Sequence, residues 1–257
     1  MRTLMVLLCL TLLSVAGHAE EMTAQQIVDK SWQLYRQAHD EKEQINLTVS
    51  YKDGRKEEKS LTRWIKYDDK GEDKVTIKFS KPAMDDGLGL LTWRHGDKVD
   101  DQWLKLPSMD KVRRISTSEQ EKYFAGTDLT YEDTRQLLYE RSRDFTYRTI
   151  MHDNQGWQIE ATPKAGVASG YSKRILHIND KYAVQSIEYF GKDAKLLKVH
   201  QNNEISYGKG GLWRPGKIDI NNQLLQRHSN LVMFDRKLNS GLPGDTFSMK
   251  YLESSRR

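Results

Sequence analysis

The chain has 257 residues, a formal net charge of +5 and a single cysteine. This length is sufficient to bury a substantial core in one large domain without disulfide bonds. Basic and acidic residues alternate along the chain. This is typical of a solvated surface and argues against a nucleic-acid binder, because such proteins gather their basic residues on one face.

The segment over residues 1–19 has the layout of a secretory signal peptide. Arg2 precedes an apolar run over residues 4–16, and Gly17 and Ala19 place small residues three and one positions before a cleavage site. The apolar run of about 13 residues is shorter than the roughly 20 that a membrane-spanning helix needs. We therefore predict cleavage after Ala19 and export of the mature chain.

The mature chain, residues 20–257, is predicted to be a single domain, because no repeat and no low-complexity linker marks a boundary. Cys9 is the only cysteine and lies in the signal peptide, so the mature chain can form neither a disulfide nor a thiolate metal site. Loss of Arg2 with the signal peptide lowers the net charge from +5 to +4.

One helix is predicted at the start of the mature chain. Thr23 and Gln26 have the spacing of a capping box. Ile27 and Trp32 then follow at helical spacing. Together these residues predict a helix over residues 23–38.

Strands are predicted after this helix. Residues 61–67 form a weaker candidate strand. The strand that contains Val75, Ile77 and Phe79 is predicted to end before Pro82. Two stronger runs alternate apolar with polar side chains, and their apolar members are Ile45, Leu47, Val49 and Tyr51, and then Val75, Ile77 and Phe79. Such alternation is typical of a sheet with one buried and one wet face. We therefore expect each run to present its apolar side chains to the interior.

The region over residues 91–133 is dense in aromatic residues and predicts a strand, a turn, a second strand, a loop and a short helix. Thr127 or Asp128 can cap this helix, which would run to Tyr139 with two acidic residues in its first turns, where the helix dipole favours them. We interpret the helix and the residues before it as a lid over the sheet. Its apolar side chains are Tyr123, Phe124, Leu129, Leu137 and Leu138.

The second half of the chain predicts further strands at 145–150, 157–161, 173–178, 184–190, 195–206, 212–220 and 224–236. Short turn signals separate them. Many strands joined by short hairpins favour an antiparallel sheet that curls into a barrel. The predicted fold class is therefore mainly β (α+β).

No constellation of residues predicts catalysis. No pair of histidines has the helical spacing of a zinc site. The adjacent carboxylates Asp85–Asp86 and Asp100–Asp101 would point to opposite faces of a strand, whereas a glycosidase needs two carboxylates that face each other. We interpret both pairs as solvated turn or edge residues. The sequence predicts no enzyme, no cofactor and no metal site.

Two interpretations stay open for the basic run that contains Lys111, Arg113 and Arg114. These residues form a solvated edge, or they contact lipid phosphates or an acidic partner surface, since arginine recognises phosphate well. The tryptophans are likewise either core residues or the lining of an apolar cavity. We assign Trp93, together with Leu104, to the cavity.

A longer pattern in the centre of the chain resembles a known family. It consists of LTW at 91–93, GD at 96–97, WLKLPS at 103–108, KVRRI at 111–115, GTD at 126–128 and YED at 131–133. These residues resemble the outer-membrane lipoprotein-sorting protein family, the LolA-like group of periplasmic carriers. The likeness extends roughly over residues 75–252, where LWRP at 212–215 and TF at 246–247 fit the C-terminal strands of the family.

The resemblance implies an incomplete antiparallel β-barrel with an N-terminal helix and a helical lid around an apolar cavity. Members of the wider fold carry the acyl chains of lipoproteins or bind other lipids in the periplasm. This branch is often associated with inner-membrane exporters of the resistance-nodulation-division (RND) type. We therefore expect a monomeric periplasmic carrier, with a cavity lined by Ile45, Leu47, Val49, Val75, Ile77, Phe79, Trp93 and Leu104. The functional residues of the classical carrier cannot be matched to this chain one by one, so none is transferred.

Two alternative functions remain open on the sequence. The protein could be a periplasmic module that senses lipid and regulates a partner. It could also be an isomerase or cyclase that uses the cavity as a template, because a fold does not fix a function. The identity and chemical state of a bound ligand would separate these alternatives.

Overall fold

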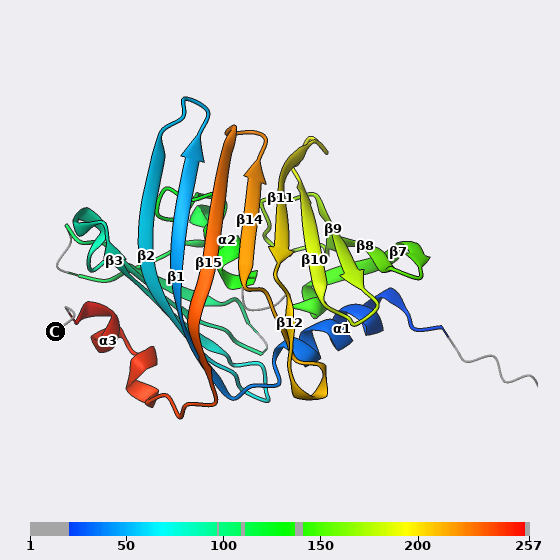
Figure 1. Cartoon of the computed structure of the whole chain (residues 1–257), viewed down its shortest axis with the longest axis horizontal. Coiled ribbons are helices and arrows are strands. Elements are labelled where there is room, and N and C mark those ends of the chain that lie inside the picture. Colours follow the sequence, from blue (N-terminus) through cyan, green and yellow to red (C-terminus); the bar gives the residue numbers. More distant parts are fainter. Residues whose placement is uncertain (1–20, 97, 109–110, 137–140, 255–257) are drawn as a thin grey trace, which may run out of the picture.

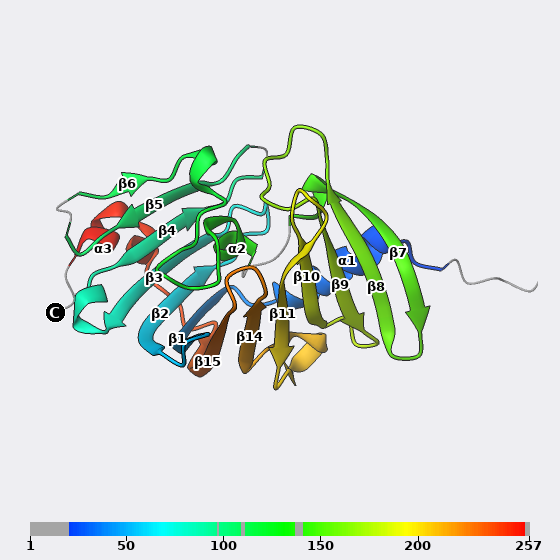
Figure 2. The same cartoon turned by 90° about the horizontal axis from the view of Figure 1, so that it is seen from above.

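The computed structural model describes residues 21–96, 98–108, 111–136 and 141–254, and its main feature is one large antiparallel sheet (Figure 1). Thirteen strands form this sheet, with β6 (Arg113–Arg114) at one edge and β7 (Phe145–Asp153) at the other. These two edge strands do not pair within the described residues, so the curved sheet stays open (Figure 2). This mainly β, incompletely closed architecture confirms the predicted fold class.

The centre of the sheet is formed by β1 (Asp40–Tyr51) and β15 (Arg227–Leu238), which pair along their whole lengths. The predicted strand around Ile45 lies inside β1, but β1 already begins at Asp40. In this early part Asp40 is buried, and Glu41 and Glu43 are buried at the positions that continue the alternation from Ile45. The inward positions in this part of β1 are therefore occupied by charged residues. A search for alternating apolar residues could not detect this part of the strand.

The other strands of the N-terminal half follow one another in the sheet as they do in the chain. They are β2 (Lys56–Lys66), β3 (Lys74–Lys81), β4 (Gly89–Trp93) and β5 (Asp101–Lys105). The weaker predicted strand over residues 61–67 is the second part of β2. The predicted end before Pro82 is confirmed.

The C-terminal half of the sheet contains β8 (Gly156–Pro163), β9 (Lys173–Asn179), β10 (Val184–Phe190), β11 (Leu196–Asn203) and β14 (Lys217–Asn222). A separate small sheet pairs β12 (Ser206–Tyr207) with β13 (Trp213–Arg214). The predicted strand over residues 212–220 is divided at Pro215, which lacks the N–H that a ladder requires. The predicted strand start at Leu224 is wrong, because this residue lies in the turn before β15.

The N-terminal helix, α1 (Ala24–Tyr35), begins with the predicted capping box. The Thr23 hydroxyl accepts a hydrogen bond from the Gln26 backbone N–H at 3.3 Å. The Gln26 side chain accepts one from the Thr23 N–H at 2.8 Å. Both interactions satisfy amides that a helix start otherwise leaves without partners. The helix ends before the predicted Ala38.

α1 is held in place by an aromatic cluster at one end of the curved sheet (Figure 1). Trp213 is 1% exposed, and its ring centroid lies 4.9 Å from Tyr35 and 5.9 Å from Trp32. Its indole N–H donates to the carbonyl of Ser31 at 3.1 Å. The short β12–β13 hairpin therefore fixes the helix by packing and by one buried hydrogen bond.

The predicted lid helix begins later than expected, and its predicted end at Tyr139 lies outside the described residues. α2 (Tyr131–Gln136) begins after Thr130, whose hydroxyl accepts a hydrogen bond from the Asp133 N–H at 3.1 Å. The Asp133 carboxylate in turn accepts one from the Thr130 N–H at 2.6 Å. Thr130 thus performs the capping that was predicted for Thr127 or Asp128. Leu137 and Leu138 lie outside the described residues.

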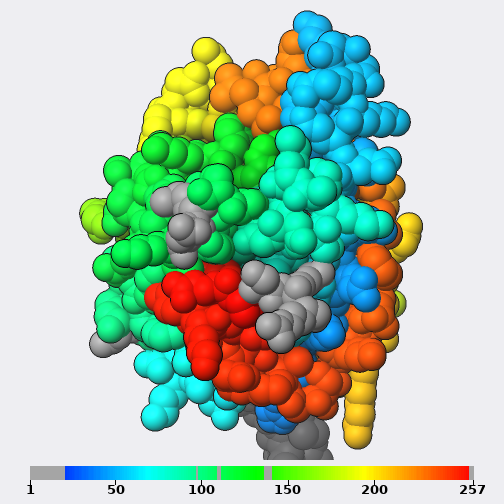
Figure 3. All heavy atoms as spheres, turned by 90° about the vertical axis from the view of Figure 1, so that its left-hand side faces the viewer, coloured from blue at the N-terminus to red at the C-terminus, as the bar shows by residue number. Residues whose placement is uncertain are grey.

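The C-terminal segment packs on the outer face of the sheet. It contains the short helix α3 (Met249–Glu253), and Figure 3 shows this segment (red) over the strands of the N-terminal half. Phe247 and Leu252 are buried there against Trp64 and Leu91. None of the helices in the described part of the chain is long and apolar enough to cross a membrane.

We predict that Trp213→Ala destabilises the protein by about 3–5 kcal/mol, because it opens a large cavity and leaves the Ser31 carbonyl without its donor. Urea-induced unfolding followed by circular dichroism measures this loss. Trp157→Ala is the matched control, since Trp157 is only partly buried, where it stacks on Tyr182 at 5.1 Å. Equal losses in the two variants would contradict the proposed role of Trp213 in holding α1.

Candidate functional site

A short segment covers the concave face of the sheet. This cover segment, residues 123–134, runs from Tyr123 through the first turn of α2 (Figure 2). Phe124 is 3% exposed, and its ring lies 5.7 Å from Phe79 of β3 and 5.6 Å from Tyr131. Leu129 is also buried in the same core. The apolar side chains of the cover segment therefore pack directly against the sheet.

Most of the predicted lining residues share the concave face. All of the following are buried in the same apolar core as Phe124 and Leu129: Ile45, Leu47, Val49, Val75, Ile77, Phe79 and Leu104. The period of two along β1 and β3 therefore assigned the inner face correctly. Whether an acyl chain contacts these residues stays a prediction.

Trp93 is the exception among the predicted lining residues, because it lies on the opposite face of the sheet. Its ring packs on Trp103 at 4.9 Å, and its indole N–H donates to the carbonyl of Phe247 at 2.9 Å. In β4 the inner positions belong to Leu90 and Thr92, which pair with inner residues of β5. The assignment of Trp93 to the cavity was therefore wrong.

A small cavity lies on the concave side. Its volume is about 30 Å³, and its lining includes Trp32, Leu129, Ile187 and His200. This volume is sufficient for a water molecule but not for an acyl chain. In the described residues the cover segment and α1 thus fill the space that the resemblance leads us to expect as a cavity.

Buried polar contacts tie the cover segment to the strands beneath it. The Asp128 carboxylate accepts hydrogen bonds from Asn222 at 3.0 Å, from Arg227 at 3.0 Å and from the Ser229 hydroxyl at 2.7 Å. Asp128 is completely buried. These contacts connect the segment to β14 and β15, so its position is determined by directional bonds as well as by apolar packing.

A second buried carboxylate, Asp133, ties α2 to β11. It forms an ion pair with Lys198 and accepts a hydrogen bond from the Tyr171 hydroxyl at 2.8 Å. Burial alone would raise the pKa of Asp133, but Lys198 and the hydrogen bonds from Thr130 outweigh it and lower that pKa. Lys198 also donates to the Asp128 carbonyl at 3.0 Å. These contacts anchor the cover segment to the sheet.

Another buried ionic cluster lies where β1 and β2 approach α1. Arg214 donates to Glu41 at 2.8 Å, and Arg236 donates to Glu43 at 2.7 Å. Arg63 pairs with Glu43. Burial would raise the pKa of Glu41, but Arg214 and Arg63 lower it. This part of the interior is therefore filled by paired charges.

The basic run at the edge of the sheet is partly neutralised. Arg113 donates to Glu119 at 3.1 Å, and Arg114 forms an ion pair with Asp101. Hydrogen bonds from Ser116 and Arg113 lower the pKa of Glu119 to about 2, so this carboxylate is charged at neutral pH. Lys111 is exposed. The edge thus presents cations that have carboxylate partners nearby, and its contact with lipid phosphates or a partner stays a prediction.

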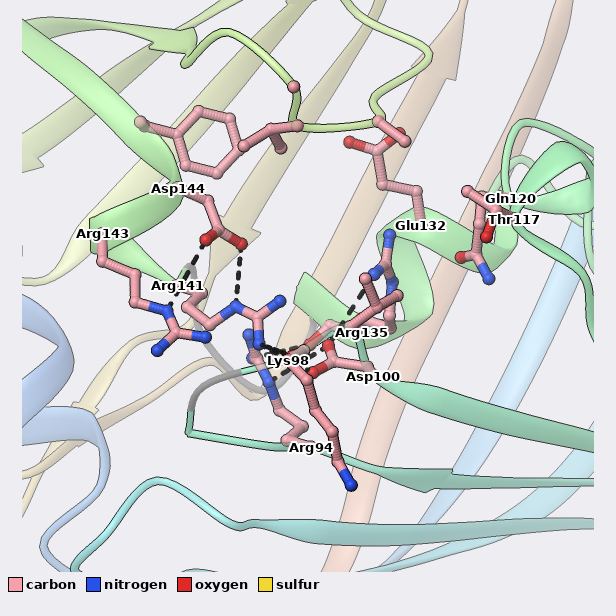
Figure 4. A pocket seen from close by; sticks show the side chains of 15 residues that line it. Arg94, Lys98, Asp100, Thr117, Gln120, Glu132, Arg135, Arg141, Arg143 and Asp144 are labelled. Carbon is pink, nitrogen blue, oxygen red and sulfur yellow. Dashed lines mark hydrogen bonds and ion pairs between the residues drawn. The ribbon is translucent and has the colours of Figure 1, made fainter.

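A basic pocket that the sequence did not indicate lies beside α2 (Figure 4). Its volume is about 340 Å³, and its cationic lining residues are Arg94, Lys98, Arg135, Arg141 and Arg143. Asp100 lies among them and is buried, so its interpretation as a solvated edge residue was wrong. The arginines come from separate segments of the chain. In the sequence, the RSR run at 141–143 is the one local pattern that indicates a basic patch there.

The described residues contain no group of three His, Cys, Asp or Glu side chains that could hold a metal ion. The histidine nearest to the basic pocket, His95, contacts Asp101 at 2.9 Å. A single histidine–carboxylate contact without a nucleophile does not form a catalytic triad.

A family model whose description reads "-like: Uncharacterized protein" matches residues 71–254. No curated protein matches the chain significantly by sequence. The matched range includes the cover segment, the basic pocket and the C-terminal strands.

Solved structures share the fold at low sequence identity. An outer membrane lipoprotein-sorting protein domain from Vibrio parahaemolyticus is 20% identical, with a TM-score of 0.83 over 90% of this chain and 98% of that one. A DUF1329 family protein from Desulfovibrio piger is 21% identical, with a TM-score of 0.82 over 89% and 97%. A LolA superfamily protein from Nitrosomonas europaea is 18% identical, with a TM-score of 0.68 over 90% and 100%. These matches confirm that the fold is LolA-like.

We predict that Asp133→Asn destabilises the protein by about 3–5 kcal/mol, because it leaves the Lys198 ammonium buried without its carboxylate. The double variant Asp133→Asn with Lys198→Met should recover part of this loss. Hydrogen exchange of the amides over residues 129–136 should accelerate in the single variant. Asp193→Asn removes the carboxylate of an exposed pair with Lys195 and should leave stability unchanged.

The same variant should change the response of stability to acid. Because the folded protein lowers the pKa of Asp133, its contribution is present above the unfolded-state pKa and is lost as the pH falls through the folded value. Asp133→Asn should therefore lose less stability on acidification than the wild type. Parallel pH profiles would show that the carboxylate does not anchor the cover segment.

Proposed function

We propose that this chain, which belongs to the family whose model matches residues 71–254 and which has a LolA-like fold, is a periplasmic carrier of lipid acyl chains. The name of the Vibrio parahaemolyticus structure refers to lipoprotein sorting, which supports a lipidated protein or a free lipid as the cargo. The signal-peptide pattern at residues 1–19 supports a location in the periplasm.

The observation that carries this proposal is the cover of the concave face. Inner residues such as Leu47, Ile77 and Leu104 form an apolar surface. It is covered by α1 with the small β12–β13 sheet and by the cover segment, whose main apolar side chains are Phe124 and Leu129. An acyl chain that displaced this segment would find an apolar surface already formed.

The free energies of burial favour such an exchange. Two large side chains such as Phe124 and Leu129 gain about 3–6 kcal/mol together when they are buried. A 16-carbon acyl chain gains on the order of 12 kcal/mol before ordering costs are subtracted. The acyl chain can thus compete with the cover segment, and the segment can fill the site again when the cargo leaves. This gives the empty carrier a closed state without exposed apolar surface.

The experiment that tests the proposal is purification from the native periplasm, followed by lipid extraction and mass spectrometry. A lipid present at one copy for each protein supports a carrier. Absence of any acyl ligand, together with failure to bind a fluorescent fatty acid, would refute it. A chemically altered ligand would instead favour the isomerase or cyclase, and retention of lipid transport after deletion of the gene would favour a sensor.

We predict that Ile77→Glu abolishes binding of a fluorescent fatty acid, because it introduces a charge on the inner face of β3. Val232→Glu is the matched control, because Val232 is 39% exposed on β15. Fluorescence titration of both variants, after circular dichroism has verified their folding, measures the difference. Equal binding would contradict the assignment of the concave face.

We also propose that the edge with Lys111, Arg113 and Arg114 contacts the anionic membrane surface or an inner-membrane RND-type exporter. A triple Glu variant at these positions should bind anionic vesicles more weakly at low salt, and the difference should shrink at high salt because exposed charges are screened beyond about 8–10 Å. A triple Glu variant of Lys52, Arg55 and Lys56 on the distant β1–β2 hairpin is the control. If the edge variant and the control variant bind the vesicles equally, Lys111, Arg113 and Arg114 form only a solvated edge.

A further inference from the structure

The basic pocket lies close to the opening of the sheet. Arg94 follows β4, and Lys98 and Asp100 lie in the connection to β5. Arg141 and Arg143 lie just before the edge strand β7. The pocket is thus built from segments next to both edges of the open sheet. We infer that it binds a phosphate group, carried by an anionic lipid headgroup or by free phosphate.

The charge of the pocket favours an anion. Five cationic side chains and three carboxylates line it, which gives its described lining a net charge of +2. One of these carboxylates, Glu132, is already engaged by the Ser169 hydroxyl at 2.6 Å and by the Gly170 N–H at 2.8 Å. A phosphate monoester carries a charge of about −1.5 to −2 at pH 7, which matches the excess.

The guanidinium groups are positioned around one buried carboxylate (Figure 4). Asp100 lies 3.1 Å from Arg141, 3.5 Å from Arg94 and 3.7 Å from Arg135. Arg141 also donates to Asp144 and to two backbone carbonyls, and Arg94 donates to the carbonyl of Arg135, so Asp100 shares these guanidinium groups with other acceptors. Its effect is to hold the three cations together and to orient them, as a preformed anion site requires.

Arg135 is the least satisfied of these cations. Its contact with Asp100 is longer than a hydrogen bond, and its Nε is buried without a hydrogen-bond partner in the described structure. Burial, together with repulsion from Arg94 and Arg141, lowers its pKa. Asp100 and Glu132 oppose this decrease, and a further anion would stabilise the protonated guanidinium in addition to them.

The volume of the pocket distinguishes a binding site from a structural ion network. Structural networks pack their charges closely, whereas this pocket has about 340 Å³ of free space beside the guanidinium groups. That value lies within the range of about 300–1,000 Å³ for small-molecule sites.

The lipid form of this inference rests on the proposed function. Arg135 lies on α2, two positions after Asp133, which is tied to the sheet by Lys198. A phosphate bound by Arg135 therefore engages the same helix that covers the concave face. A headgroup in the basic pocket would allow its acyl chains to occupy that face. The free-phosphate form does not depend on the carrier function.

The first test uses inorganic phosphate on the full mature protein. Phosphate should raise the melting temperature and bind measurably by calorimetry, with chloride at equal ionic strength as the control. Arg135→Gln should weaken phosphate binding about 10-fold to 100-fold. Arg143→Gln, at a side chain that is 46% exposed, should fold normally and weaken it less. Arg148→Gln, at an exposed arginine on β7, should leave it unchanged.

The second test separates the two sources of phosphate. Binding of a fluorescent acyl phosphate monoester is compared with that of the fluorescent alcohol of the same chain length. Tighter binding of the phosphate form, lost in Arg135→Gln and Arg143→Gln, supports a headgroup site. Equal binding of the acyl phosphate and the alcohol overturns the proposal of a headgroup site but is consistent with the proposed carrier function. If neither binds, the proposed carrier function fails, and the phosphate titration alone decides whether the pocket is an anion site. Absence of phosphate binding in the wild type overturns the inference.

Discussion

Two buried carboxylates on one short segment determine how the interior of this protein is arranged. A single curved sheet has one apolar face that must be covered, and here the cover is too short to do so by apolar contact alone. Asp128 binds side chains of β14 and β15, and Asp133 binds Lys198 of β11. Desolvation of buried ion pairs largely offsets their attraction. The contacts of Asp128 and Asp133 therefore determine one closed position of the cover segment, but they add little to the free energy that stabilises that position.

The outline of the fold could be predicted because it depends on local patterns. Apolar alternation placed Ile45 and Val75 on strands, and the Thr23–Gln26 pair placed the start of α1. The early part of β1 was missed, since its inward residues are Glu41 and Glu43. Their partners, such as Arg214, are distant in the sequence. No local pattern reveals that a buried position is occupied by a pair of charges.

The site could be predicted only in part, for a related reason. A period of two assigns a face correctly where polar and apolar residues alternate, as around Leu47. In β4, Leu90 and Leu91 are both buried but on opposite faces, so no alternation of apolar and polar residues indicates which face Trp93 occupies. The basic pocket brings Arg94 together with Arg135 and Arg141 through the fold alone. Such convergence becomes visible only in three dimensions.

The pairing of β1 with β15 has a consequence for how the chain folds. The first strand of the sheet lies between β2 and the last strand, and Asp40 accepts a hydrogen bond from Ser240, 200 residues away. Contacts between such distant parts of a chain form slowly, because a long loop must close before they form. Until β15 is available, one edge of β1 has no strand to pair with, and unpaired edges promote aggregation. The residues that complete the sheet are thus synthesised after its other strands, and the nascent chain depends on them to protect its centre.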